Sequence, residues 1–237
     1  MEKLDLAMHK AAVLTEALPY IQDFCGSTVL VKVGGSVMES DANLDSLLAD
    51  IAFMDAVGMK VVLVHGGGKA ISAALKASGI APVFVDGLRF TDAPSMEIVR
   101  RTLNNVVNAD LVKRLQRLKA NARPVHGNWM FTAKKIEKPD RGFVGEPVAA
   151  DLRIVGEMMD AGILPVVTPL ATGEDGRLYN VNADSAAAFL AKELKVRKFA
   201  VVSDVPGLLR NPDDPSSLMS TLRLADVAEL TADGTIS

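Results

Sequence analysis

The sequence contains few of the residues on which several common chemistries depend. Cys25 is the only cysteine among 237 residues, so the chain can form neither an internal disulfide nor a cysteine-based zinc site. The three histidines, His9, His65 and His126, lack the spacing of metal ligands. No serine nucleophile elbow is present. The sequence therefore gives little support to a hydrolase or a metalloenzyme, and we assign no residue as a metal ligand.

The chain also lacks an excess of positive charge and any long apolar run. Its 26 lysines and arginines are spread along the sequence and the formal net charge is -3, so we expect no nucleic-acid partner. Charged residues interrupt the apolar ones at the N-terminus, which argues against a secretory signal, and no stretch is long enough to cross a bilayer. We expect a cytoplasmic protein without a membrane partner.

Short apolar runs alternate with helical patterns along the chain. Strand-like runs rich in β-branched residues cover 27–33, 60–65, 163–170 and 198–203. Apolar residues at helical spacing cover 43–57, 95–118, 152–162 and 184–194. This alternation predicts an α/β fold, a three-layer α/β/α sandwich with a largely parallel central sheet.

Two of the predicted helices have distinct apolar stripes. Residues 3–17 form an amphipathic pattern that Pro19 interrupts, and because this helix precedes the first strand we expect its stripe to pair with another subunit. In the longest helix, 95–118, a stripe that we expect to face the core consists of Met96, Val99, Leu103, Val107, Leu111, Leu115 and Leu118.

Two predicted strands end in glycine. Gly34 and Gly35 follow the first strand, and three glycines, 66–68, follow the second, so both turns lie at the carboxyl edge of a parallel sheet. Glycines at that edge let backbone N–H groups approach phosphate oxygens, although a tight strand-to-helix turn explains either run alone. Neither turn has the spacing of a P-loop or of a dinucleotide-binding motif.

A lysine accompanies the first glycine turn. Lys32 lies between Val31 and Val33, so it faces away from them, and in a sheet covered on both faces it needs an anion. An exposed lysine at the sheet edge is the alternative.

Polar residues cluster at two further places. Asn180, Asn182 and Asp184 alternate in an extended stretch before an alanine-rich helix, which indicates a polar site, while Asp184 could instead be the N-cap of that helix. Arg89 lies in an extended segment, where its guanidinium could bind a carboxylate with two hydrogen bonds, or it could be a surface residue.

These motifs occur in the same order in N-acetylglutamate kinases of the amino acid kinase family, which the chain resembles over most of its length. KVGGS (32–36) resembles the family's K-x-GG, VVLVHGGGK (61–69) its VHGGG, DGLRFTD (86–92) its GLR-x-T and YNVNADSAA (179–187) its N-x-NAD-x-AA. The resemblance implies an ATP-dependent kinase that phosphorylates the side-chain carboxylate of N-acetyl-L-glutamate, in arginine biosynthesis, with Mg²⁺ held largely by phosphate oxygens.

The resemblance also implies roles for individual residues. Lys32 would stabilise the transferring phosphoryl group, and Asp184 would orient that lysine. The groups implied to bind ATP are Gly34, Gly35 and Asp204, although Asp204 could equally be a turn residue. The groups implied to bind the acyl amino acid are Gly67, Gly68, Arg89, Asn180 and Asn182.

The same resemblance predicts three parts: an N-terminal helical extension (1–26), an acyl-substrate half (27–170) and a nucleotide half (171–237). The family's Gly-Lys-Asp hairpin is missing from 121–140, and the family continues beyond Ser237 to a second active-site lysine, so we expect a truncated nucleotide half. A kinase for another acylamino acid, such as acetylaminoadipate, and a non-catalytic regulatory or binding paralogue remain alternatives. Family members with such an extension are hexamers inhibited by arginine, so we expect a homo-oligomer, a dimer or a hexamer.

Overall fold

The computed structural model describes residues 2–35, 37–203, 205, 207–211 and 213–235. They form two compact units, 1–202 and 203–237. The three functional parts expected from the sequence, with divisions after residues 26 and 170, stay a prediction.

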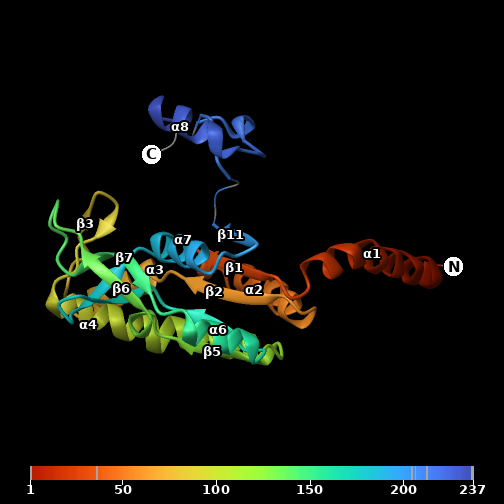
Figure 1. Cartoon of the computed structure of the whole chain (residues 1–237), viewed down its shortest axis with the longest axis horizontal. Helices are drawn as coiled ribbons and strands as arrows, with labels where there is room; N and C mark the ends of the chain where they lie inside the picture. The colour runs from red at the N-terminus through yellow and green to blue at the C-terminus, as the bar shows by residue number, and fades with distance from the viewer. Residues whose placement is uncertain (1, 36, 204, 206, 212, 236–237) are drawn as a thin grey trace. The chain divides into compact units, whose positions relative to one another are not determined.

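A parallel five-stranded sheet is the centre of the larger unit (Figure 1). Its strands are β1 (Thr28–Val33), β2 (Lys60–His65), β5 (Ala122–Val125), β8 (Leu164–Val167) and β11 (Lys198–Val202). They lie in the order β11-β1-β2-β8-β5, and every neighbouring pair is parallel. The predicted parallel sheet is confirmed. Within the described residues β11 forms an edge, where Phe199 and Val201 are exposed.

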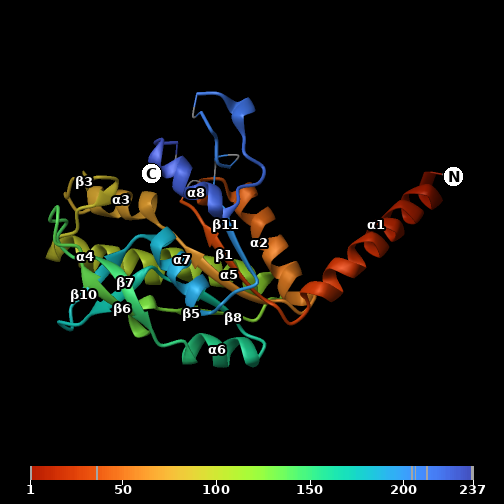
Figure 2. The ribbon, with the colours of Figure 1, turned by 45° about the horizontal axis from the view of Figure 1, so that its top comes forward.

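Helices cover both faces of this sheet (Figure 2). On one face, α2 (Asp41–Ala56) and α5 (Ala109–Arg117) pack on the odd-numbered valines of β1. On the other, α6 (Arg153–Asp160) and α7 (Ala183–Glu193) pack on Leu30 and on the even-numbered valines of β2. Strand alternation thus supplies two apolar layers, because successive side chains point to opposite faces. This arrangement confirms the predicted three-layer sandwich.

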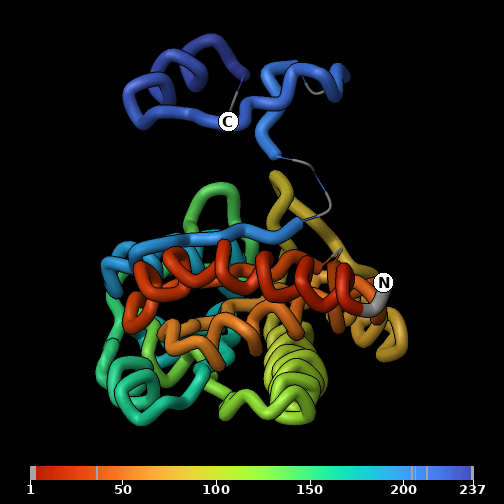
Figure 3. The backbone as a smooth tube through the Cα atoms, turned by 90° about the vertical axis from the view of Figure 1, so that its right-hand side faces the viewer, coloured from red at the N-terminus to blue at the C-terminus, as the bar shows by residue number. Residues whose placement is uncertain are grey.

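The longest predicted helix is one continuous coil (Figure 3), whose middle is a π-helix. It comprises α4 (Ala93–Arg101), the π-helix η2 (Thr102–Asn108) and α5. Most of the predicted stripe is buried, but Leu118 lies beyond the last turn and is exposed. A π-helical stretch inside an α-helix is rare, and such stretches are frequent at functional sites.

Smaller elements surround the carboxyl edge of the sheet. Helix α3 (Gly68–Ala77) follows β2, and β3 (Phe84–Val85) pairs with β4 (Leu88–Arg89) in a short hairpin. A second sheet closes on itself in the order β10-β7-β6-β9. Its strands are β6 (Phe131–Lys135), β7 (Val144–Ala150), β9 (Leu170–Gly173) and β10 (Leu178–Val181). Short 3-10 turns are η1 (Val37–Glu39) and η3 (Gly127–Trp129).

The N-terminal helix α1 runs from Glu2 to Phe24. The prediction that it ends near residue 17 is wrong, because Pro19 removes only one backbone donor and the helix continues past it. Its C-terminal end is attached to the loop before β11: Arg197 pairs with Asp23 and lies over the ring of Phe24, 4.2 Å from the centroid. Where the chain is described, no helix has both the length and the apolar character needed to cross a membrane.

The smaller unit, 203–237, contains η4 (Pro215–Ser217) and α8 (Leu224–Ala232). A β-bridge joins Leu209 to Leu218.

Candidate active site

The two glycine turns lie side by side at the carboxyl edge of the sheet. A Cβ atom on Gly35 would lie 3.9 Å from the backbone nitrogen of Gly68, and one on Gly66 would lie 3.8 Å from the nitrogen of Gly35. On Gly67 a Cβ would meet Leu103 Cδ2, in the π-helix, at 2.7 Å. The two turns thus lie in van der Waals contact, and the close approach of η2 explains why Gly67 carries no side chain.

The second glycine turn opens a helix without a side-chain cap. Gly67 is the N-cap of α3, and as a glycine it offers no side-chain oxygen to the N–H groups of the first helical turn. Such N–H groups, together with the helix dipole, favour an anion. In the glycine turn after β1, by contrast, the N–H of Gly34 donates to the carbonyl oxygen of Val202 at 2.9 Å and so extends the sheet. The roles of these glycines toward a ligand stay predictions.

Lys32 and Asp184 form an ion pair beside the glycine turns. The lysine lies in β1 between Val64 of β2 and Val201 of β11, and its Nζ is 2.8 Å from Oδ1 of Asp184. Its side chain is only 9% exposed, whereas that of Asp184 is 60% exposed. The alternative of an exposed lysine at the sheet edge is therefore wrong.

The start of α7 shows which residue caps the helix. Asn182 is the N-cap, and its Oδ1 accepts hydrogen bonds from the N–H groups of Asp184 (2.8 Å) and Ser185 (3.1 Å). Asp184 is thus not the N-cap, and its carboxylate is left to pair with Lys32. Capping accounts for the side-chain oxygen of Asn182, and its role in substrate binding stays a prediction. Asn180 lies in β10, where its Nδ2 donates to Thr91 Oγ1 at 3.4 Å.

Arg89 reaches from β4 to the glycine turn of α3. Its Nη2 donates to the carbonyl oxygen of Gly68 at 2.7 Å and to Ser72 Oγ at 2.8 Å, and its guanidinium lies over the ring of Phe84, 4.7 Å from the centroid. The residue is 7% exposed, and burial lowers the pKa of the guanidinium. Nη1 is buried and has no hydrogen-bond partner within the described chain. A buried cation with an unused donor needs an acceptor, and a carboxylate fits it.

The structure adds His65, which the sequence analysis did not assign to the site. Its Nδ1 lies 2.7 Å from the carbonyl oxygen of Gly66, and its Nε2 lies 3.0 Å from Nδ2 of Asn108 at the end of the π-helix. Burial lowers the pKa of His65 to about 4. In the neutral ring with its proton on Nδ1, Nδ1 donates to the carbonyl oxygen of Gly66 and Nε2 accepts from Nδ2 of Asn108. The ring thereby links the second glycine turn to the π-helix. No local spacing indicates this contact, because 43 residues separate the partners.

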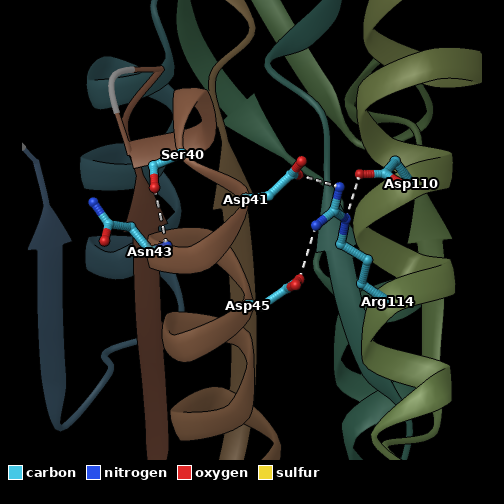
Figure 4. A network of polar contacts seen from close by, with 6 residues as sticks. All are labelled: Ser40, Asp41, Asn43, Asp45, Asp110 and Arg114. Carbon is cyan, nitrogen blue, oxygen red and sulfur yellow. Dashed lines mark hydrogen bonds and ion pairs between the residues drawn. The ribbon is translucent and has the colours of Figure 1, made fainter.

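A cluster of charges joins α2 to α5 near the site (Figure 4). Arg114 donates to Asp41 and Asp45 of α2 and to Asp110 of its own helix at 2.7–2.8 Å. These hydrogen bonds raise the pKa of the Arg114 guanidinium. The cluster fixes the two helices of one layer.

The last predicted site residue, Asp204, lies outside the described residues. Across the described ranges, no group of three or more His, Cys, Asp or Glu side chains could hold a metal ion.

Comparisons with known proteins agree with this geometry. The model of the amino acid kinase family matches residues 27–237. An acetylglutamate kinase of Heliobacterium modesticaldum is 41% identical over 98% of this chain and 83% of its own length, and one of Archaeoglobus fulgidus is 39% identical over 97% and 83%. Among solved structures, an N-acetylglutamate synthase of Neisseria gonorrhoeae, complexed with coenzyme A and N-acetyl-glutamate, is similar with a TM-score of 0.79 at 26% identity, over 94% of this chain and 51% of that one. The chain belongs to the amino acid kinase family.

Proposed function

We propose that this protein is an acetylglutamate kinase, which transfers the terminal phosphoryl group of ATP to the side-chain carboxylate of N-acetyl-L-glutamate. The observation that carries this proposal is the buried Nη1 of Arg89, a donor without a partner beside the second glycine turn. The main-chain carboxylate of an acylamino acid supplies the missing acceptor. Its side chain then extends along the glycine turns toward Lys32.

The chemistry needs little from the protein beyond position and charge. A side-chain carboxylate is ionised at neutral pH, with a pKa near about 4.3, so no general base is required. One of its oxygens attacks the terminal phosphorus of ATP, the bond from that phosphorus to the bridging oxygen breaks, and ADP leaves with the electron pair. Lys32 neutralises charge on the transferring group, and Asp184 holds the lysine in place through their ion pair of 2.8 Å.

The backbone at the glycine turns fits two anions. The N–H groups of Gly35, Gly67 and Gly68 lie at adjoining turns, where the phosphate chain and the attacking carboxylate must meet. As a member of a kinase family the protein uses ATP, and we propose that Mg²⁺ enters bound to the phosphate oxygens of ATP. The ion supplies positive charge to the phosphates when it is bound.

A coupled assay of ADP release tests the function directly. We expect turnover with N-acetyl-L-glutamate and ATP, and much less with N-acetyl-aspartate, N-acetyl-aminoadipate or free glutamate. Faster turnover with N-acetyl-aminoadipate would mean that the protein phosphorylates that acylamino acid by the same mechanism. Absence of turnover with every acylamino acid, in protein shown to be folded, would refute the kinase proposal and favour a non-catalytic paralogue.

We also propose that the enzyme is a cytoplasmic homo-oligomer in which α1 contacts a second copy. Apolar side chains along α1 are largely exposed, including Leu4, Met8 and Leu14, and such a stripe is typical of an interface. Deletion of residues 1–20 should lower the mass measured by light scattering, from a hexamer to a dimer. An unchanged mass would refute the role of α1. Addition of arginine to the kinase assay tests feedback inhibition.

A further inference from the structure

Residues 141–143 lie between the two predicted substrate-binding elements. On one side, the N–H of Thr91 donates to the carbonyl oxygen of Arg141 (2.9 Å), and the N–H of Phe143 donates to that of Thr91 (2.6 Å). On the other side, the N–H of Asn180 donates to the carbonyl oxygen of Phe143 (2.9 Å). Backbone hydrogen bonds thus run without a break from the base of the β3–β4 hairpin to β10.

The side chain of Arg141 extends this connection to the tip of the hairpin. Its Nε donates to the carbonyl oxygen of Val85 at 3.1 Å, and its Nη2 donates to Oδ2 of Asp86 at 2.8 Å. Its Nη1 is 3.4 Å from the carbonyl oxygen of Pro139. Arg141 is only 7% exposed, whereas the side chain of its partner Asp86 is 69% exposed. One residue therefore contacts the base, a strand and the turn of the same hairpin.

The hairpin needs such support. Each of its strands has two residues, and an isolated two-stranded hairpin is at best marginally stable in water. Asp86 and Gly87 form its turn with positive φ values of 46° and 75°. On its other side the hairpin is anchored mainly through Arg89, by hydrogen bonds to Gly68 and Ser72. Because the proposed substrate also binds Arg89, that anchor alone leaves the hairpin free to shift as substrate enters.

The cost of burying Arg141 argues against a role in overall stability alone. Removing the Arg141 guanidinium from water is unfavourable, and its partner Asp86 is 69% exposed, so the ion pair lies partly in water, where such pairs add little net stability. A guanidinium instead gives directional hydrogen bonds that fix one geometry. That property suits a residue which must hold a binding element in register.

We propose that Arg141 is a positioning residue that holds the β3–β4 hairpin so that Arg89 presents its unused donor to the acyl substrate. The inference rests on the proposed function for its kinetic consequence, but the hairpin contact itself does not depend on it. Arg141 touches neither substrate nor ATP in this account and acts through Arg89.

Replacing Arg141 tests the proposal in the full-length protein. In Arg141→Met, which keeps most of the side-chain length, we expect KM for N-acetyl-L-glutamate to rise by about tenfold, the effect of losing one charge-assisted hydrogen bond. KM for ATP should stay within about twofold, because the hairpin is not at the proposed ATP turn. Arg141→Lys should restore part of the loss, since lysine keeps the charge but not all three contacts. Equal increases in both KM values, or no change in either, would overturn the proposal.

Hydrogen exchange separates this inference from the kinase assignment. In Arg141→Met, the amides of Phe90 and Thr91, bonded to Val83 and Arg141, should exchange faster while those of the central sheet keep their wild-type rates. Asp86→Asn should also speed up exchange of these amides, and this variant replaces Arg141→Met in the experiment if Arg141→Met does not fold. The matched control is Arg153→Met, whose exposed ion pair with Asp151 lies at the start of α6. Unchanged exchange in the hairpin, or faster exchange throughout, would overturn the proposal even if the protein proves inactive as a kinase.

Discussion

Replacement of His65 by asparagine should change how the stability of this protein depends on pH. His65 is fully buried between Gly66 and Asn108, and burial lowers its pKa from 6.5 to about 4. Between these pH values the unfolded chain binds a proton at this position that the folded protein does not. The free energy of unfolding therefore falls as the pH is lowered from about 6.5 to about 4, and His65 causes no further loss below that.

The size of this effect follows from the same two pKa values. One pKa unit corresponds to about 1.4 kcal/mol, so His65 accounts for a loss of about 3 kcal/mol between neutral pH and pH 4. Asparagine cannot titrate, although its amide can still donate to the carbonyl of Gly66. The variant should be less stable than wild type at pH 7, and the difference should shrink by about 3 kcal/mol at pH 4.

Urea denaturation followed by circular dichroism at about pH 7, 6, 5 and 4 measures this difference directly. The difference between wild type and His65→Asn removes the contribution of carboxylates common to both. His126→Asn is the comparison variant, because burial lowers the pKa of His126 too, but this residue is only partly buried. A constant difference between wild type and His65→Asn at all four pH values would refute the burial argument.

Three further predictions concern the site. Lys32→Ala should lower kcat about a hundredfold or more with little change in KM, because its charge matters most in the transition state; a wild-type kcat in steady-state assays would contradict its role. Arg89→Lys should raise KM for the acyl substrate far more than KM for ATP, because a single ammonium nitrogen cannot replace both Nη2, which bonds Gly68 and Ser72, and Nη1, which is left for the substrate. Equal effects on both KM values would show that the residue is structural. Gly142→Ala should lower the free energy of unfolding by about 2–5 kcal/mol in denaturation experiments. The reason is that Gly142 has a φ of 70° and that a Cβ there would lie 2.2 Å from the carbonyl oxygen of Thr91. A loss below about 1 kcal/mol would contradict this geometry.

Features that depend on local periodicity could be predicted from the sequence. Alternation along β1 places Lys32 on the face opposite Val31 and Val33, and its burial follows once both faces are covered. The two glycine turns each follow a strand of a parallel sheet, so their position at the same edge of that sheet follows from the strand direction. The layers of the fold were therefore predictable from the sequence, as was the edge of the sheet at which the two glycine turns lie.

Features that depend on distant contacts or on backbone detail were not accessible. The pairs His65–Asn108 and Arg141–Asp86 join residues 43 and 55 positions apart, and no spacing rule connects them. A π-helix keeps apolar residues at intervals close to those of an α-helix, so the pattern over 95–118 predicts only one continuous helix.

The second sheet was missed for a different reason. Its strand β7 contains Gly145 and Pro147, which normally argue against a strand, and its burial pattern does not alternate regularly. Tertiary packing in the closed sheet outweighs these local preferences.

The hydrogen bonds of Thr91 to both proposed substrate-binding elements affect which substrates can react. Thr91 is fully buried and its hydroxyl lies between the carbonyl oxygen of Arg89 (3.1 Å) and the amide of Asn180 (3.4 Å). The groups proposed to bind one end of the substrate are thereby held relative to the glycine turns, where we propose that the other end reacts. The distance between these two binding points is therefore fixed. A substrate with one more methylene group must bend to fit, and a substrate with one fewer cannot bring its side-chain carboxylate to the phosphorus. Chain length, rather than charge, should decide which acylamino acid is phosphorylated.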